Sequence, residues 1–185
     1  TYVWRDIMQY TATYDSPLGK ITMAGSERGL AGLWFEGQKY FADTLSGETA
    51  EKEDFPLFVQ VREWLDVYFS GKDPGFTPPL DLQGTPFRLT IWQLLQEIPY
   101  GETITYKEIA EKAVARRGIK TMSAQAVGGA VGHNPVSIIV PCHRVVGSNG
   151  SLTGYAGGID KKIKLLTLEQ APLDDLFVPR KGTAL

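Results

Sequence analysis

The sequence predicts an α+β fold in which a small antiparallel sheet is followed by a mainly helical region. Three short segments rich in aromatic and β-branched residues, separated by turn-forming residues, lie within residues 10–35; this pattern is typical of an antiparallel meander. Farther along, apolar residues recur every three or four positions, as on one face of a helix. A proline-containing linker, residues 71–84, separates the two patterns. We therefore expect domains over residues 1–80 and 84–171, followed by a tail over residues 172–185.

The first domain is expected to contain three strands and one helix. The strands are predicted over residues 10–14, 20–24 and 30–35, with a turn containing proline and glycine over residues 15–19. Helical spacing of apolar residues predicts a helix over residues 58–69. The first seven residues could be an extension that is not part of this domain.

In the second domain, capping residues predict where the first two helices begin. Thr85 and Pro86 fit the N-cap and the first helical position of one helix, which a Pro-Tyr-Gly sequence ends. Thr105 and Glu108 fit a capping box at the start of the next helix. We expect this second helix to end at about Ala113.

Two further helices are predicted over residues 123–131 and 160–170. The first of them and the helix before it have the outline of a helix-turn-helix, although the connecting loop is longer than usual. That loop is expected to be basic, with Arg116, Arg117 and Lys120.

The charge of the chain is distributed unevenly. The net charge of the 185 residues is −2, but residues 1–84 hold 7 Lys and Arg against 13 Asp and Glu, whereas residues 85–185 hold 12 against 8. This asymmetry is expected if only the second half meets a polyanion, and it is equally compatible with ordinary solvated charge.

The cysteine count excludes several kinds of site. Cys142 is the only cysteine and there are two histidines, which excludes an internal disulfide and predicts no metal centre. Cysteine usage favours a reducing compartment, such as the bacterial cytoplasm. No apolar run is long enough to cross a membrane, so we expect no membrane partner.

The residues around Cys142 are the strongest candidates for chemistry. An apolar strand, expected over residues 136–140, leads through Pro141 to Cys142, His143 and Arg144. Neighbouring cationic groups favour the reactive thiolate, so a nucleophile–base pair is one interpretation and a buried structural cysteine is the other. Because adjacent side chains on a strand point in opposite directions, cooperation requires a turn or a bridging water. The histidine also needs an acceptor for its second nitrogen, which periodicity alone does not identify.

The predicted helix over residues 123–131 is unusually rich in glycine. Gly128, Gly129 and Gly132 lie in or next to it, and Gln125 is its only long polar side chain. Each glycine weakens a helix by about 1 kcal/mol relative to alanine. Two explanations remain open: close approach of the helix backbone to a narrow groove, or a tight helix crossing inside the protein.

Taken together, these motifs resemble those of the O6-alkylguanine-DNA alkyltransferases, also called methylated-DNA–protein-cysteine methyltransferases. The resemblance is close over residues 84–170 and only general over the first domain. The motifs that carry it are residues 141–147 (PCHRVVG), 134–135 (NP), 84–87 (GTPF), 98–103 (IPYGET), Tyr106, 126–130 (AVGGA) and 154–158 (GYAGG).

The resemblance implies a ribonuclease-H-like first domain and a winged-helix-like second domain. It also implies DNA repair by direct damage reversal, in which the alkyl group of O6-alkylguanine, or less readily of O4-alkylthymine, moves irreversibly to Cys142. The implied partner is double-stranded DNA containing alkylated guanine, bound by a monomer through the minor groove with the base rotated out of the helix. No cofactor is implied. Without a second thiol to accept the alkyl group, each molecule should react once.

The resemblance also implies roles for individual residues. Cys142 would be the nucleophile, His143 would act on it through a water, and Glu169 would orient His143. Tyr106 would donate a hydrogen bond to the departing guanine; without the family it could equally be an aromatic residue packed on the core. Asn134 would tie the glycine-rich helix to the active-site turn, or would otherwise be a simple turn residue.

Further residues are expected to contact the substrate or the DNA. The carbonyl groups of Cys142 and Val145 would accept the guanine amino group, and Gln125 stands where the family usually has an arginine finger. The other expected contacts are Ala126, Val127 and Gly128 of the helix, Arg144, and the alkyl-pocket loop of Tyr155, Ala156 and Gly157.

Three other functions remain to be weighed. A non-enzymatic binder of alkylated DNA would lack the reactive cysteine. A cysteine hydrolase using Cys142 and His143 would turn over repeatedly and would need an oxyanion hole, for which no motif is evident. A transcription factor would need base-reading side chains, and Gln125 alone cannot read a sequence.

Overall fold

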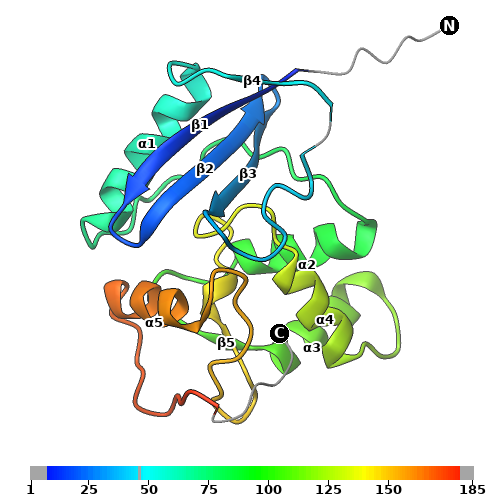
Figure 1. The fold of residues 1–185 in the computed structure, drawn as a ribbon. Coiled ribbons are helices and arrows are strands. Elements are labelled where there is room, and N and C mark those ends of the chain that lie inside the picture. The colour runs from blue at the N-terminus through cyan, green and yellow to red at the C-terminus, as the bar shows by residue number, and fades with distance from the viewer. Residues whose placement is uncertain (1–7, 46, 180–185) are drawn as a thin grey trace, which may run out of the picture.

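A four-stranded sheet forms the first part of the chain. The computed structural model describes residues 8–45 and 47–179 of the whole chain. Its strands lie in the order β3-β2-β1-β4 (Figure 1). They are β1 (Gln9–Ser16), β2 (Gly19–Ser26), β3 (Gly29–Phe35) and β4 (Thr49–Glu51). The three predicted strands pair antiparallel. Strand β4 was not predicted and pairs with β1 in parallel; its three residues carry too little pattern to be recognised.

Helix α1 (Pro56–Phe69) covers one face of this sheet (Figure 1). Its inward side chains include Phe58, Val61 and Leu65, all fully buried in the cluster that also contains Ile21 and Met23 of β2. The spacing of these residues predicted the helix, and Ile21 and Met23 lie two positions apart along β2, as residues on the covered face of a sheet do.

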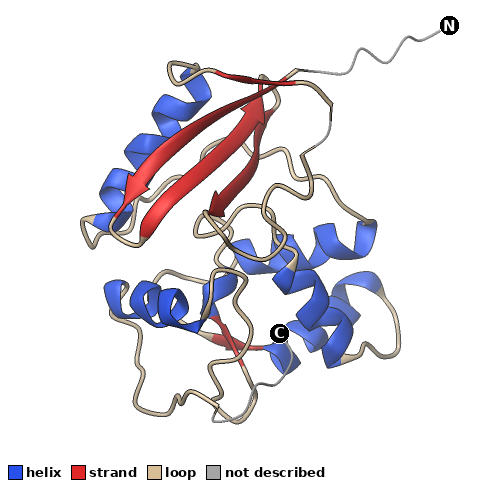
Figure 2. Cartoon of the chain, viewed as in Figure 1, coloured by secondary structure: helices blue, strands red, loops and turns tan. Residues whose placement is uncertain are grey.

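The first two helices of the second part begin where the capping residues predicted, and the third begins close to its predicted start. They are α2 (Pro86–Gln96), α3 (Tyr106–Arg117) and α4 (Ala124–Gly132). The hydroxyl oxygens of Thr85, Thr105 and Ser123 each accept a hydrogen bond from the backbone N–H three residues later, as N-caps do. Figure 2 shows these helices gathered at the end of the molecule away from the four-stranded sheet.

The predicted end of the second of these helices was wrong. Helix α3 does not stop near Ala113 but continues to Arg117, so two of the expected loop residues are helical. Arg116 is held by a two-pronged ion pair with Glu97, at 2.7 and 3.0 Å. The helix ends at Gly118, whose φ of 66° gives the left-handed C-cap that favours glycine.

The apolar segment over residues 136–140 is not the strand that the sequence predicted. Only Val136 pairs, in an isolated bridge with Leu33 of β3, and the residues after it form turns. Ile138 adopts a positive φ of 70°. The side chain of Asn134 replaces a strand partner: its Nδ2 donates to the Val136 and Val140 carbonyls at 3.2 and 2.8 Å, and its Oδ1 accepts from the Val136 N–H.

The remaining elements complete an α+β fold, which confirms the predicted class. A short turn of 3-10 helix, η1 (Cys142–Arg144), leads into β6 (Val145–Val146), which pairs in parallel with β5 (Ile104–Thr105). Helix α5 (Ile159–Leu168) packs against η1. One hydrophobic cluster runs through both parts of the chain, and it includes Leu33, Leu65 and Trp92.

Parts of two expectations fall outside the described residues. These are the possible extension over residues 1–7 and the end of the tail, residues 180–185. Within the described ranges, none of the helices combines the length and the apolar character that a membrane crossing requires.

Candidate active site

The turn that follows Asn134 places Cys142 at the first position of η1. The cysteine is 5% exposed, and its backbone N–H donates to the Val140 carbonyl at 2.8 Å. Because Asn134 also bonds that carbonyl, one buried amide fixes the geometry of the whole turn. The chain therefore turns where the sequence had suggested a straight strand, and this removes the objection that Cys142 and His143 must point to opposite faces.

The environment of the Cys142 thiol contains one cation that the sequence analysis missed. Burial raises the pKa of the Cys142 thiol, whereas a hydrogen bond with Asn134 and the positive charge of Lys162 lower it. Arg144 was expected to favour the thiolate, but its guanidinium group bonds Glu169 and the Ile98 carbonyl. The cation that favours the thiolate is Lys162.

Lys162 is fully buried, in a position that lysine rarely occupies without partners. Its ammonium group donates to the carbonyl oxygens of Val145 and Thr153. Burial lowers the pKa of Lys162 to about 8, and the nearby Cys142 opposes that shift. One signal in the sequence could have revealed it: positions 162, 165, 166 and 169 share one helical face, and Leu165 and Leu166 are buried.

His143 and Glu169 lie together in the interior, beside Arg144. The His143 Nε2 atom is hydrogen-bonded to Glu169 Oε2. The other carboxylate oxygen, Oε1, accepts from Arg144 Nε at 2.7 Å and from the Gly101 N–H at 3.0 Å. Tyr68 donates to Glu169 Oε2 at 2.6 Å. The carboxylate is thus saturated with donors, and its position is fixed from four sides.

This environment sets the charge of each partner. Burial lowers the pKa of His143, although Glu169 opposes the shift. Burial alone would raise the pKa of Glu169, but its hydrogen bonds and charges with His143 and Arg144 prevail and bring that pKa to about 2. At neutral pH the pair is therefore a neutral imidazole donating to a carboxylate. The His143 Nδ1 atom, which is buried and bonds no group of the described chain, is then a proton acceptor.

A cleft of about 810 Å³ opens beside this centre. It is bordered by α4, by the start of α3 and by the loop over residues 147–156, and its lining includes five of the predicted residues. These are Tyr106, Gln125, Gly128, Tyr155 and Ala156. Cys142 lies near two of them: burial raises the pKa of Tyr106 and of Tyr155, and a negative charge on Cys142 raises both further.

The hydroxyl group of Tyr106 has partners in the alkyl-pocket loop. It donates to the carbonyls of Thr153 and Gly154, at 3.2 and 3.3 Å. Burial raises the pKa of Tyr106, so this side chain keeps its proton and remains a donor. The sequence also allowed Tyr106 to be an aromatic residue packed on the core. This holds in part, because its ring contacts the main hydrophobic cluster.

Several other predicted contacts do not reach the cleft. Val127 is fully buried in the core, so its side chain cannot touch DNA. Arg144 is 7% exposed and its Nη1 donates to the Ile98 carbonyl at 2.7 Å. Ala126 is exposed but lies outside the cleft lining. The absent side chain of Gly157 leaves room for the Tyr155 ring, which a Cβ would approach to 2.9 Å.

The two expected carbonyl acceptors are already engaged within the protein. The Cys142 carbonyl accepts from the Val145 N–H, and the Val145 carbonyl accepts from Lys162. A carbonyl oxygen has two lone pairs, so each of them can accept a second hydrogen bond from a ligand.

The glycines of α4 face open space. A Cβ built at Gly128, Gly129 or Gly132 would meet no atom within 4 Å. A tight helix crossing inside the protein would have placed atoms there, so that explanation is wrong. The bare face of the helix lies along the cleft and is available to an external surface.

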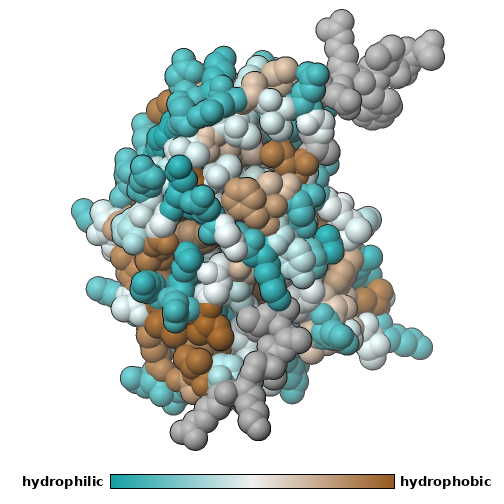
Figure 3. Space-filling view, viewed as in Figure 1, coloured by the Kyte–Doolittle hydropathy of each residue, from teal (hydrophilic) through white to brown (hydrophobic). Residues whose placement is uncertain are grey.

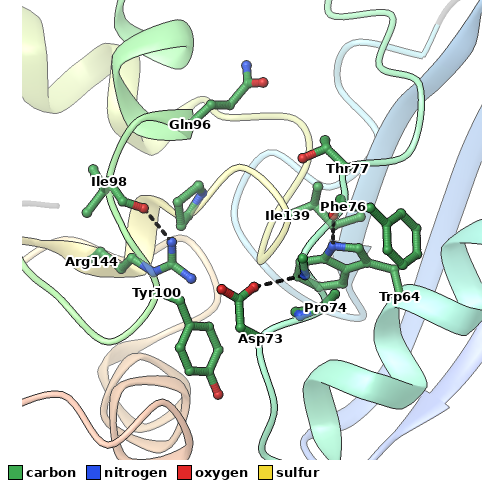
Figure 4. Close-up of a pocket in the computed structure, with 12 residues that line it drawn as sticks. Trp64, Asp73, Pro74, Phe76, Thr77, Gln96, Ile98, Tyr100, Ile139 and Arg144 are labelled. Atoms are coloured by element: carbon green, nitrogen blue, oxygen red, sulfur yellow. Dashed lines mark hydrogen bonds between the residues drawn. The ribbon is translucent and has the colours of Figure 1, made fainter.

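A second, smaller pocket of about 230 Å³ lies on the far side of Arg144 (Figure 4). Trp64, Asp73 and Tyr100 line it together with Arg144. Figure 4 shows the Arg144 guanidinium bonded to the Ile98 carbonyl at its edge. Cys142 and His143 are absent from the lining of both pockets, but the larger cleft is lined by Tyr106 and Tyr155, whose pKa values the charge of Cys142 helps to raise. The chemistry therefore centres on the larger cleft.

Two family models match the chain and together cover most of it. The model for the 6-O-methylguanine DNA methyltransferase ribonuclease-like domain matches residues 9–82. The model for the 6-O-methylguanine DNA methyltransferase DNA binding domain matches residues 86–171.

Individual proteins are similar over nearly the whole length. A methylated-DNA–protein-cysteine methyltransferase of Mycolicibacterium paratuberculosis is 45% identical over 158 residues, which are 85% of this chain and 90% of that protein. One of Haemophilus influenzae is 38% identical over 175 residues, 94% of this chain and 90% of that protein. A crystal structure of Mycobacterium tuberculosis OGT in complex with DNA matches with a TM-score of 0.75 and 42% identity, covering 91% of this chain and 97% of that one.

Proposed function

Because the chain belongs to the 6-O-methylguanine DNA methyltransferase family, we propose a residue-level account of how it repairs DNA. The protein is a methylated-DNA–protein-cysteine methyltransferase: it binds DNA and moves an alkyl group from a damaged base to its own cysteine. The substrate in this proposal is O6-alkylguanine in double-stranded DNA. The observation that carries it is that Cys142, the single cysteine of the sequence, lies near Tyr106 and Tyr155, which line the cleft that the bare face of α4 borders.

Proton removal from Cys142 is the first step. His143 is held by Glu169 with Nδ1 as the acceptor, and it takes the thiol proton through a water molecule. Lys162 and Asn134 stabilise the thiolate that results, since both lower the pKa of Cys142. A neutral histidine suits this role, because a protonated one could not accept.

Alkyl transfer then forms a carbon–sulfur bond and breaks the carbon–oxygen bond. The electron pair of the broken bond stays on the guanine, whose growing negative charge receives a hydrogen bond from Tyr106. Over the whole reaction the thiol proton is exchanged for the alkyl group: guanine regains a proton and cysteine becomes a thioether. A thioether sulfur is a poor leaving group, so each molecule reacts once.

Binding through the minor groove is supported by the shape and chemistry of α4. The glycines present little bulk, as a narrow groove requires, and Gln125 is the single side chain of α4 that could read a base edge in the major groove. The target base must leave the stack to reach Cys142, which costs a few kcal/mol. Gln125 would occupy the space that the extruded base leaves. Its side chain can hydrogen-bond the unpaired base but carries no charge. In this proposal the protein acts as a monomer in a reducing compartment, where the Cys142 thiol is not oxidised.

The repaired DNA provides the test. A duplex with one O6-methylguanine is incubated with excess protein, digested to nucleosides and analysed by chromatography. We expect O6-methyldeoxyguanosine to be replaced by deoxyguanosine, the strand to be unbroken before digestion, and a minor-groove-binding drug to slow the reaction. An abasic site or a cut strand would contradict transfer to the protein. Inhibition only by a major-groove ligand would contradict the docking.

A further inference from the structure

The loop over residues 37–45, which follows β3, is fixed to the second part of the chain by hydrogen bonds at two points. The Gln38 side chain is buried, and its Oε1 accepts from the Ser137 hydroxyl at 3.3 Å. The next backbone N–H, that of Lys39, donates to the Ala156 carbonyl at 3.1 Å. The loop thus touches both the active-site turn and the alkyl-pocket loop.

A ring contact provides a third attachment. Tyr40 stacks on His133 at the end of α4, with ring centroids 3.8 Å apart and planes inclined by 23°. His133 Nδ1 is hydrogen-bonded to the Gly129 carbonyl at 2.7 Å, so the histidine is part of the helix terminus. Tyr40 has a φ of 58°, a left-handed conformation that a bulky residue adopts only when its surroundings hold it there.

These side chains face the same cleft as the bare side of α4. Lys39, Tyr40 and His133 line it together with Gln125 and Gly128. Tyr40 remains 40% exposed despite its stacking. Figure 3 shows hydrophilic and apolar side chains interspersed over the face where the sheet and the helical part meet.

The charge of the cleft differs from that of the domain that supplies the loop. The first 84 residues carry an excess of acidic groups. Among the described residues that line the cleft, in contrast, Lys39 and Lys107 are basic and none is Asp or Glu. Among its described residues, the acidic domain therefore contributes Lys39 and no carboxylate to the lining of the cleft.

We propose that this loop is a second DNA-binding element, which contacts the duplex backbone next to the extruded base. Lys39 supplies charge for a phosphate, and the stacked rings of Tyr40 and His133 hold the loop against α4. The inference rests on the proposed function, because the partner is the same duplex. It revises the expectation that only the basic second half meets the polyanion.

Binding at several salt concentrations tests this contact. Fluorescence anisotropy with a labelled duplex is measured for the wild type, Lys39→Ala, Tyr40→Ala and Tyr40→Phe. Lys72→Ala is the matched control, since Lys72 is exposed in the same domain but lines neither pocket. We expect Lys39→Ala to bind roughly 3- to 10-fold more weakly in 0.1 M salt and to lower the slope of log K against log salt by about one. Tyr40→Ala should weaken binding, whereas Tyr40→Phe and Lys72→Ala should bind nearly as the wild type does.

Reaction with the free base O6-methylguanine separates this inference from the proposed function. The free base needs no DNA contact, so all the variants should react with it at the wild-type rate. If Lys39→Ala and Tyr40→Ala bind the duplex as tightly as the wild type, with an unchanged salt slope, the loop does not contact DNA and the inference is wrong. Equal losses in duplex binding and free-base reaction would also overturn it, because the loop would then only brace the pocket. If the wild type itself transfers no alkyl group, the proposed function fails, and the duplex-binding series still decides the role of the loop.

Discussion

The imidazole of His143 and the carboxylate of Glu169 are hydrogen-bonded to each other in the protein interior, although 26 residues separate them in the sequence. Both side chains are inaccessible to solvent. Their contact joins η1 to the end of α5, so it connects the reactive turn to the last helix of the fold. The same contact fixes which nitrogen of His143 is free to act on Cys142, and it makes the stability of the fold depend on the charge of Glu169.

Acid should weaken the fold through Glu169. Its pKa is about 2 in the folded protein and about 4.3 in an unfolded chain. Between these values the unfolded state binds more protons, so stability is present above about pH 4.3 and is lost as the pH falls toward 2. We expect Glu169 to contribute on the order of 1–3 kcal/mol of this loss. Urea unfolding at pH 5 and pH 3 measures it, and Glu169→Gln should show a correspondingly smaller change between the two.

The control is Glu102→Gln, which removes a carboxylate that is exposed. Its pH dependence should match that of the wild type. An identical loss of stability in Glu169→Gln and the wild type would mean that the buried network does not hold the carboxylate charged.

Replacing Lys162 by Met should make Cys142 less reactive. The change removes the cation that lowers the pKa of the thiol, so the pH dependence of the reaction should move upward and the rate at pH 7 should fall roughly 3- to 10-fold. Iodoacetamide labelling of Cys142 across the pH range measures both. Lys164→Met alters an exposed lysine of the same helix and should leave the profile unchanged. An unchanged profile for Lys162→Met would exclude Lys162 from the environment of the thiol.

Side chains introduced at the glycines of α4 should weaken DNA binding without preventing folding. Because a Cβ at Gly128 meets no neighbour, Gly128→Ala should raise the free energy of unfolding by about 0.5–1 kcal/mol. Gly128→Leu should fold as well, yet bind the duplex at least about tenfold more weakly, because its side chain occupies the face that approaches the groove. Thermal melting and anisotropy test the pair. Tight binding by Gly128→Leu would show that DNA docks elsewhere.

Arginine at position 125 should strengthen DNA binding. Gln125 is exposed and lines the cleft, so Gln125→Arg adds a charge there. The expected gain is roughly 3- to 10-fold in affinity, with a salt slope steeper by about one. Gln93→Arg makes the same change at an exposed position of α2 outside the cleft and should add much less. If Gln125→Arg alters neither the affinity nor the repair rate, Gln125 does not contact the duplex.

Local signals in the sequence predicted most of the fold. The predicted N-caps at Thr85 and Thr105 depend on a hydroxyl and a backbone N–H three residues away, so short windows contain the whole interaction. The predictions failed where a side chain takes the hydrogen bonds of the backbone. Residues 136–140 have the composition of a strand, but the Asn134 amide takes the hydrogen bonds that a neighbouring strand would have made.

The site was predictable in its motifs and less so in its orientations. The motif around Cys142 identified the reacting residue and its neighbours, but no pattern showed that Arg144 turns inward to Glu169. Lys162 was missed because a lysine in an amphipathic helix is normally solvated, and only the folded structure supplies the carbonyl oxygens that hold its ammonium group. The sequence did not show which face of α4 is buried, and Val127 was expected to contact DNA. The structure shows that Val127 lies on the buried face.

The mass of the intact protein after reaction tests the central claim most directly. The wild type and Cys142→Ala are each mixed with a duplex containing O6-methylguanine and weighed by mass spectrometry. We predict that the wild type gains one methylene unit per molecule, however much damaged DNA is supplied, and that Cys142→Ala gains none. Repair of several lesions by each molecule, or repair that leaves the protein's mass unaltered, would contradict the account.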